Sequence, residues 1–419
     1  MWLLLCMIFI MPFEKNPYLK ISDSFLGIFP EFTLIKLLGL VGLVWVLWQV
    51  GAGRISIGLL ASRQGKAFFV FLGIVVLAGQ ISGTGILAFT RYLSLALFFP
   101  ITLAAVQSEQ DVKRALWACV GVMILVFPYA LRQLLRFGGR LGVGLYEPNY
   151  LALALVLLMP LAVVIARQRE TTGQQACWFA GVGILFASLI LTGSRGGFLG
   201  FLTGMGLLCF KSARRPFLVA SVATVGLLLF VFVVPTDLGQ RLRASLDADV
   251  QDVGVAASTE AHLDLFKAGW GMIGANPVFG VGLGQFKQQS SVYYDVAKPR
   301  IAHNTYIQIA AESGIPALIA FLLFIGLTLR SLSHIEIMAG VQGRLHMRQW
   351  AVALQVGLGG YLVSAFFLSA QFEKFFWLIV FLSIAMERIL VAEATVQEEE
   401  PIGEPPWAKW YQSDSSGVP

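Results

Sequence analysis

The chain has 419 residues, of which 57% are hydrophobic and only 13% are charged. Soluble globular domains carry about 25% charged residues, so this composition excludes an ordinary soluble protein and is typical of a membrane protein. The formal net charge of +6 does not indicate nucleic-acid binding, because the Lys and Arg residues lie in short loops between apolar blocks, where they encode membrane topology.

The apolar residues fall into blocks of about 17 to 24 residues, the length that a helix needs to cross the hydrocarbon core. The blocks lack the alternation of a β-barrel strand. The sequence therefore predicts an all-α polytopic integral membrane protein with about 12 transmembrane helices. The expected spans are residues 1–13, 33–51, 67–83, 92–106, 115–134, 148–166, 176–193, 196–211, 216–235, 308–330, 350–369 and 373–391. The first block is read as a span and not as a cleaved signal, because Pro12 breaks it and it has no basic start.

The short loops predict the orientation of the chain in a bacterial inner (cytoplasmic) membrane. Most of their Lys and Arg residues lie in the loops that the positive-inside rule makes cytoplasmic. These loops are residues 52–66, 107–114, 167–174, 211–215 and 330–349. Both termini are then inside, and the acidic, Pro-rich segment 392–419 is predicted to be a disordered cytoplasmic tail.

One long connection divides the chain. Residues 1–235 are expected to hold about nine spans and residues 306–391 about three. Between them, residues 236–305 have ordinary polarity and are predicted to form a large periplasmic loop with its own structure. Within it, residues 258–273 have the period of an amphipathic helix, with Ser258 at the N-cap and Gly274 as the stop. Its predicted apolar face, which would lie over the membrane surface, consists of Leu263, Leu265, Phe266, Trp270 and Ile273.

The predicted topology brings polar residues from distant parts of the chain to the outer face. They are Arg91, the run Glu147 to Asn149, the run Gly193 to Gly197, and His303 with Asn304. Arg195 lies in a tight turn where the next helix begins. A helix N-terminus beside a guanidinium suits phosphate, although an Arg that anchors a helix end would also explain it.

Two histidines are candidates for chemistry. His303 precedes a stripe of Gln308 and Glu312 at helical offsets, and it could act as a general base near neutral pH. An interfacial helix start with polar caps would explain the same residues. His262 lies on the amphipathic helix, where it is either functional or a residue of the polar face.

The Gly-rich run Asn276 to Phe286 has the spacing G-x-G-x-G and follows a helix, so it does not match the nucleotide-binding fingerprint. We expect this run to pack as a shaped loop against the membrane domain. The sequence shows neither metal-ligand spacing of His, Cys and carboxylates nor a serine nucleophile elbow.

Four segments occur in a characteristic order: Glu147–Tyr150, Gly193–Gly197, Pro277–Phe286 and His303–Gly314. In their contexts they resemble the O-antigen ligase and polymerase superfamily, over roughly residues 30–390. Those enzymes are membrane proteins of similar layout, with one large periplasmic loop late in the chain.

The resemblance implies periplasmic glycan transfer. The donor would be a saccharide on undecaprenyl pyrophosphate, and the acceptor a hydroxyl of the lipid A core or of a growing glycan. Arg195 would bind the pyrophosphate, His303 would be the base, Asn304 would orient it, and Arg91 would lie beside the phosphate. No metal or nucleotide cofactor is expected.

The chain departs from the family pattern at two places. His262 stands where relatives often carry an Arg, and either it or Arg241 or Arg243 would supply that charge. Ile315 to Ala317 follow Gly314 where ligases tend to have a second Gly. The acceptor therefore remains open between lipid A core, as in an O-antigen ligase, and a growing glycan, as in an O-antigen or exopolysaccharide polymerase.

A small-anion or solute transporter is the alternative from another class. Transporters place ionisable residues near the bilayer midplane. Here the middles of the spans are nearly free of charge and the polar groups gather at one face, which favours an interfacial enzyme.

Overall fold

The computed structural model describes residues 1–14, 19–25, 29–143, 147–211, 224, 253–296 and 299–399. The predicted span at 216–235 lies almost wholly outside the described residues. The N-terminal half contains α1 (Trp2–Ile10), a 3-10 turn η1 (Met11–Phe13), β1 (Lys20–Phe25), β2 (Phe29–Thr33), α2 (Leu34–Gly51), a 3-10 turn η3 (Ile57–Leu60), α3 (Arg63–Ile81), α4 (Gly85–Ala105), α5 (Glu109–Phe137), α6 (Pro148–Arg167), α7 (Thr172–Leu191) and α8 (Arg195–Lys211). The remainder contains α11 (Val253–Ala275), α12 (Phe286–Tyr293), α13 (Thr305–Val341), α14 (Leu345–Ser364) and α15 (Lys374–Glu399).

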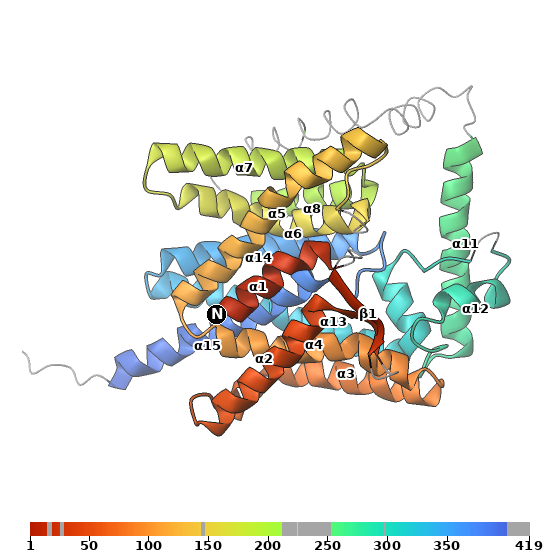
Figure 1. Cartoon of the computed structure of the whole chain (residues 1–419), viewed down its shortest axis with the longest axis horizontal. Helices are drawn as coiled ribbons and strands as arrows, with labels where there is room; N and C mark the ends of the chain where they lie inside the picture. Colours follow the sequence, from red (N-terminus) through yellow and green to blue (C-terminus); the bar gives the residue numbers. More distant parts are fainter. Residues whose placement is uncertain are drawn as a thin grey trace, which may run out of the picture.

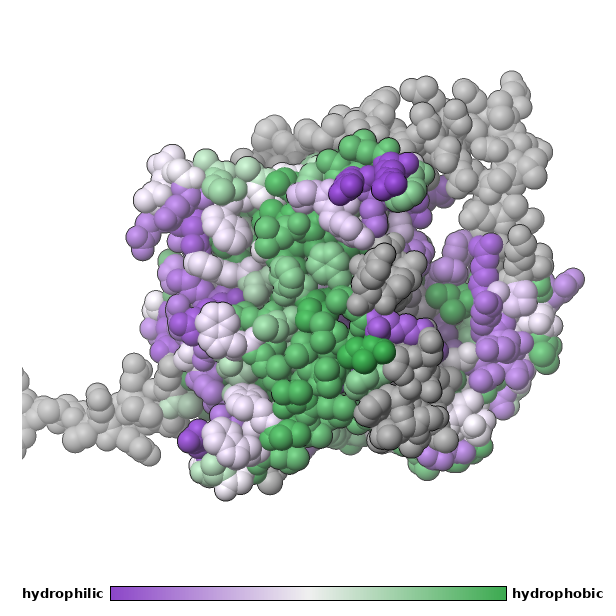
Figure 2. All heavy atoms as spheres, in the orientation of Figure 1, coloured by the Kyte–Doolittle hydropathy of each residue, from purple (hydrophilic) through white to green (hydrophobic). Residues whose placement is uncertain are grey.

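The long helices lie side by side in a bundle, and α11 lies across one end of it (Figure 1). Hydrophobic side chains cover the middle of the bundle, while hydrophilic ones gather toward both ends (Figure 2). A membrane-spanning bundle has this distribution, because only its middle contacts hydrocarbon. The chain is thus an all-α polytopic membrane protein, as predicted.

Within the described ranges, seven helical segments are long and apolar enough to cross a membrane. They are Leu34–Gly51, Arg63–Ile81, Glu109–Phe137, Pro148–Arg167, Thr172–Leu191, Ile315–Val341 and Lys374–Ala392. Trp2–Phe13 and Thr90–Ala105 are shorter apolar helices. Each predicted span outside 216–235 coincides with a helix, but the number of spans stays a prediction.

The structure differs from the sequence-based expectations in two further places. Strands β1 and β2 form an antiparallel hairpin between the first two predicted spans, where no element was predicted. Helix α15 continues to Glu399, past Val391, where the predicted tail begins. The added turns include Ala392 to Ala394, which are strong helix formers, so propensity extends the helix beyond the apolar block.

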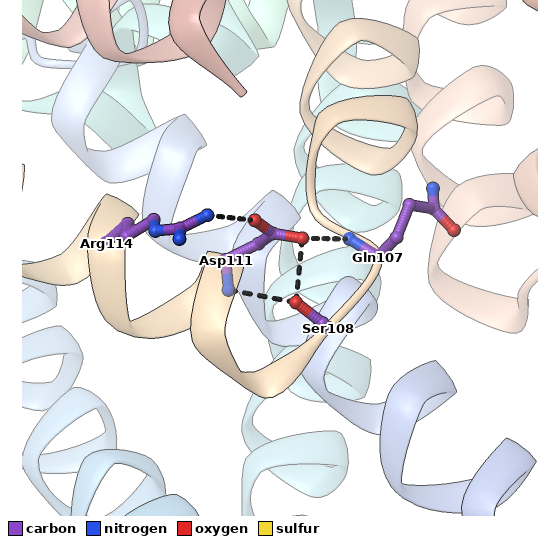
Figure 3. A network of polar contacts seen from close by, with 4 residues as sticks. All are labelled: Gln107, Ser108, Asp111 and Arg114. Atoms are coloured by element: carbon purple, nitrogen blue, oxygen red, sulfur yellow. Dashed lines mark hydrogen bonds and ion pairs between the residues drawn. The ribbon is translucent and has the colours of Figure 1, made fainter.

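Helix α5 begins at the end of the bundle opposite α11 (Figure 1). Side chains cap its first turn (Figure 3). Ser108 Oγ accepts a hydrogen bond from the backbone N–H of Asp111 at 3.2 Å and donates to the Asp111 carboxylate at 2.8 Å. Arg114 pairs with the same carboxylate at 3.3 Å. The bonds satisfy a free N–H of the first turn, and the carboxylate complements the positive end of the helix dipole.

Close packing of α14 against α6 and α8 sets the position of the Arg195 turn. A Cβ added to Gly200 of α8 would come within 2.4 Å of the Gly360 carbonyl oxygen, and one added to Gly357 within 2.1 Å of the Leu157 carbonyl oxygen. Ser364 Oγ also donates a hydrogen bond to the Gly196 carbonyl at 2.9 Å. Small residues let these backbones approach, so the start of α8 is held against α14.

Candidate active site

His303 occupies an unusual backbone position directly before α13. Its φ is 49°, in the left-handed region that non-glycine residues rarely adopt. The next residue, Asn304, is the N-cap of α13, and its side-chain oxygen accepts hydrogen bonds from the N–H groups of Tyr306 and Ile307, each at 3.0 Å. The capping bonds define where the helix starts and leave the half-buried His303 just outside it.

The imidazoles of His262 and His303 meet edge to face, with ring centroids 5.2 Å apart. Burial lowers the pKa of His262 below its usual 6.5, and the charges of Arg300 and Arg195 lower it further. Burial also lowers the pKa of His303, with added effects of His262 and Arg300 that Glu147 partly opposes. Both rings are therefore neutral at neutral pH, which lets His303 accept a proton.

Arg195 is the first residue of α8, and its exposed side chain lies at the α11 end of the bundle. Gly193 turns the chain with φ 58°. Ser194 Oγ accepts a hydrogen bond from Gly197 N–H at 3.2 Å and caps the helix. A Cβ on Gly196 would come within 2.7 Å of Phe367, so only glycine permits this approach. The guanidinium stands beside the positive end of a helix, an arrangement that favours an anion.

Arg140 holds the Arg195 turn from the segment between α5 and α6. Its Nε donates a hydrogen bond to the Thr192 carbonyl at 2.6 Å, and its Nη2 donates to Asn149 Oδ1 at 2.7 Å. Asn149 Nδ2 in turn donates to Glu147 at 3.0 Å. A polar chain therefore joins the start of α6 to the turn before α8. The sequence analysis did not identify Arg140. The only local sequence signal is that Arg140 follows two glycines, Gly138 and Gly139, which both have positive φ in the structure.

Arg300 is a second residue that sequence analysis missed. It is exposed, and its charge acts on both His262 and His303. The one sequence signal is a basic residue three positions before a histidine. Arg241 and Arg243, the predicted substitutes for the missing loop arginine, lie outside the described residues.

Arg91 has different surroundings from the other predicted site residues. Its guanidinium lies over the Phe372 ring at 5.8 Å from the centroid, and its charge acts on Glu312. The structure thus brings His262 and His303 together, with Arg195, Arg300 and Glu147 close enough for their charges to act on these rings. Arg91 lies instead near Phe372 and Glu312. The role of Arg91 beside a phosphate stays a prediction.

The Gly-rich run packs against α13, as predicted. Val281 N–H donates to the Ala311 carbonyl at 2.8 Å and Ile315 N–H donates to the Pro277 carbonyl at 2.7 Å, across a kink in α13 at Gly314. Leu283 N–H donates to Thr84 Oγ1 at 3.0 Å. These bonds consume backbone N–H groups that a phosphate-binding loop would need free, so the run is a docking segment for the membrane helices.

Helix α11 corrects two details of the predicted amphipathic helix. It begins at Val253, before the predicted cap at Ser258. The predicted apolar face loses Leu265, which is 1% exposed and packs with Met272 and Phe286, whereas Leu263 and Trp270 stay 53% and 55% exposed, so the placement of this face over the membrane surface stays a prediction. One side of α11 is buried in a small core that it forms with α12 and α13. The helical period of the sequence does not show which apolar residues enter this core.

The described part of the chain contains no group of three or more His, Cys, Asp or Glu side chains arranged to hold a metal ion. The arrangement of the site consists instead of two neutral imidazoles among guanidinium groups at the end of a membrane bundle. Such an arrangement suits an anion at its cations and proton transfer at its imidazoles.

A family model described as O-antigen ligase matches residues 180–322. The matched region contains Arg195, His262 and His303, the three predicted residues that the structure brings together. No curated protein matches the chain significantly. The order of the motifs, the helical membrane architecture and this match over residues 180–322 together support the resemblance of the chain to the O-antigen ligase superfamily.

Proposed function

We propose that this protein transfers a saccharide from undecaprenyl pyrophosphate to an acceptor hydroxyl on the periplasmic side of the bacterial inner membrane, in the manner of an O-antigen ligase, with the lipid A core as acceptor. The family supports glycan transfer of the O-antigen ligase or polymerase type in general. One observation carries the proposal further: the rings of His262 and His303 meet at one end of the bundle, where the charges of Arg195 and Arg300 act on His262.

The proposed reaction needs a base and an anion site. His303 removes the proton from the acceptor hydroxyl as that oxygen attacks the anomeric carbon of the donor saccharide. The bond from this carbon to the pyrophosphate oxygen breaks, and undecaprenyl pyrophosphate leaves with the bonding electrons. Arg195 stabilises the charge that develops on the leaving group. His303 then releases its proton to water. The lowered pKa of His303 keeps it unprotonated and ready at neutral pH.

The same electrostatics assign a different role to His262. Because burial and two arginines lower its pKa, His262 is neutral and cannot replace a cation. It can still donate one ring N–H to a phosphate oxygen or to the acceptor. Arg300, whose charge acts on both rings, is the better source of the second positive charge. We assign Arg300 this role.

The positive-inside rule supports the proposed orientation. The loops at the end opposite α11 carry most of the Lys and Arg residues of the short loops, so the α11 end faces the periplasm. Undecaprenyl-linked glycans that have been flipped across the membrane present their pyrophosphate at this face. The donor then reaches the site from within the bilayer.

Glycan profiling of a deletion strain tests the proposal. The strain is complemented with wild-type, Arg195→Ala or His303→Ala protein, and surface polysaccharide and lipid-linked precursors are resolved by gel and mass spectrometry. His346→Ala is the matched control, because this exposed histidine stacks on Trp350 at the opposite end of the bundle. We expect both site variants to insert normally and to lack transfer, and the control to behave as wild type.

The accumulated precursor identifies the type of transfer. Long lipid-linked chains without surface attachment indicate a ligase, and single lipid-linked repeat units indicate a polymerase. Normal glycan from the His303→Ala strain would refute the enzyme proposal and make transport the next activity to measure.

A further inference from the structure

His303 is strained, and the strain needs an explanation. It is the one non-glycine residue with a positive φ in the described part of the chain. A side chain in the left-handed region costs free energy, so such a residue persists only where its surroundings impose it. The backbone on both sides of His303 is therefore the place to look for what holds the imidazole in position.

Both neighbours of His303 are fixed by buried hydrogen bonds. On one side, Ala302 N–H donates to Gln308 Oε1 at 2.9 Å. On the other, Asn304 caps α13, and Thr305 N–H donates to the Ala365 carbonyl at 2.9 Å. The backbone after His303 is thus fixed by the Asn304 cap and by the helix itself. The backbone before His303 depends instead on the side chain of Gln308, which accepts the hydrogen bond from Ala302 N–H.

The orientation of the Gln308 amide is determined by its partners. Its Oε1 accepts from Ala302 N–H and also from Ser369 Oγ at 2.8 Å, while its Nε2 donates to Glu312 Oε1 at 2.5 Å. A flipped amide would point its NH₂ at the Ala302 N–H and its oxygen at a carboxylate. Gln308 and Glu312 are 4% and 1% exposed, so water cannot replace these bonds.

Glu312 supports this orientation because its Oε1 is the acceptor that the Gln308 NH₂ group faces, and burial raises the pKa of this carboxyl group. The same oxygen accepts from Phe286 N–H at 3.2 Å, which ties the Gly-rich run to the network. The second carboxylate oxygen is buried and makes no hydrogen bond with any described group. A buried acidic group in such a position costs stability, and a positioning function explains its presence.

We propose that Glu312 and Gln308 are positioning residues that hold His303 in its left-handed conformation, so that its imidazole lies against His262 within the cationic group of Arg195 and Arg300. Both side chains are buried, so in this proposal they act through His303. The inference rests on the proposed role of His303 as the base.

Three variants of the full chain test the inference. Gln308→Met keeps the length of the side chain and removes its three hydrogen bonds, to Ala302, Ser369 and Glu312. The double variant Gln308→Glu with Glu312→Gln keeps an acceptor for Ala302 N–H and a donor–acceptor pair between the two positions. Gln355→Met is the matched control. Gln355 lies in α14, and its Nε2 donates a hydrogen bond to Glu336, which lies near the other end of α13, at 2.9 Å.

The readouts separate positioning from folding and from binding. The rate of undecaprenyl pyrophosphate release is measured in vesicles with native lipid-linked donor and saturating acceptor extract, together with the affinity for undecaprenyl pyrophosphate and the melting temperature. We expect Gln308→Met to slow release by about tenfold or more, with affinity and melting temperature no more changed than in Gln355→Met. The double variant should recover most of the lost rate.

An equal rate loss in the control variant, a parallel loss of affinity, or no recovery in the double variant would overturn the positioning role. The His303→Ala variant distinguishes the two levels of the proposal. Transfer by His303→Ala refutes the proposed function itself. An inactive His303→Ala beside a fully active Gln308→Met refutes only the positioning inference.

Discussion

His262 of α11 and His303, which directly precedes the N-cap of α13, meet edge to face with ring centroids 5.2 Å apart. Burial and the charge of Arg300 lower the pKa of both rings, and the charge of Arg195 also lowers that of His262, which favours the neutral form of each. In the proposed function, this pair provides the acid–base chemistry and the nearby guanidinium groups provide positive charge for the pyrophosphate.

The first prediction concerns pH. In the proposed mechanism transfer requires unprotonated His303, whose pKa is lowered by burial and by the neighbouring His262 and Arg300, so the acidic fall in rate should have its midpoint below the usual imidazole pKa of 6.5. Arg300→Gln removes a positive charge that lowers this pKa, so the acid limb should move up toward 6.5. Initial rates of undecaprenyl pyrophosphate release against pH provide the measurement. Arg330→Gln, at the opposite end of the bundle, serves as control, and an unchanged limb in Arg300→Gln would count against the electrostatic account.

The second prediction concerns the leaving group. Arg195→Ala should weaken binding of undecaprenyl pyrophosphate by roughly tenfold or more, the equivalent of one charge-assisted hydrogen bond. Arg195→Lys should recover part of the affinity, because it keeps the charge but loses the planar fork. Binding to purified protein in detergent measures both. Equal affinity in Arg195→Ala and wild type would show that this arginine only anchors a helix end.

The third prediction concerns Arg140. Arg140→Gln loses the hydrogen bonds to Thr192 and Asn149, so the Arg195 turn should loosen and the affinity for undecaprenyl pyrophosphate should fall by about threefold to tenfold. Arg136→Gln is the matched control, since this exposed arginine of the same region lies over Phe137. If both variants lose affinity equally, general surface charge and not the turn would be responsible.

The fourth prediction concerns the docked Gly-rich run. Gly314→Ala should destabilise the protein by on the order of 2 kcal/mol or more, because backbone strain and a steric clash add. The residue has φ 87°, and its new Cβ would lie 2.0 Å from the Val278 carbonyl oxygen. Gly274→Ala, where a Cβ meets nothing within 4 Å, is the control. Thermal unfolding in detergent compares the two, and equal melting temperatures would contradict the close packing.

Several features of the site could be read from local residue patterns. Arg195 was found because two apolar blocks leave no room for a loop around it, and His303 because a polar stripe follows it into a span. Gln308 and Glu312 were visible as that stripe, but their hydrogen bonds to Ala302 and Phe286 were not. Hydrogen-bond partners depend on where side chains point in the folded protein, and the spacing of polar residues along the sequence does not determine this.

The sequence by itself determined the class of the molecule, its spans and one face where polar motifs gather. These follow from local physics, because a backbone in hydrocarbon must form its own hydrogen bonds and therefore becomes a helix wherever the apolar block is long enough. The tertiary structure alone decided which motifs touch. Three features depend on how distant helices pack: the contact between His262 and His303, the hydrogen bond from Arg140 to Thr192, and the division of the α11 apolar face. Packing in turn depends on the shapes of both contacting surfaces.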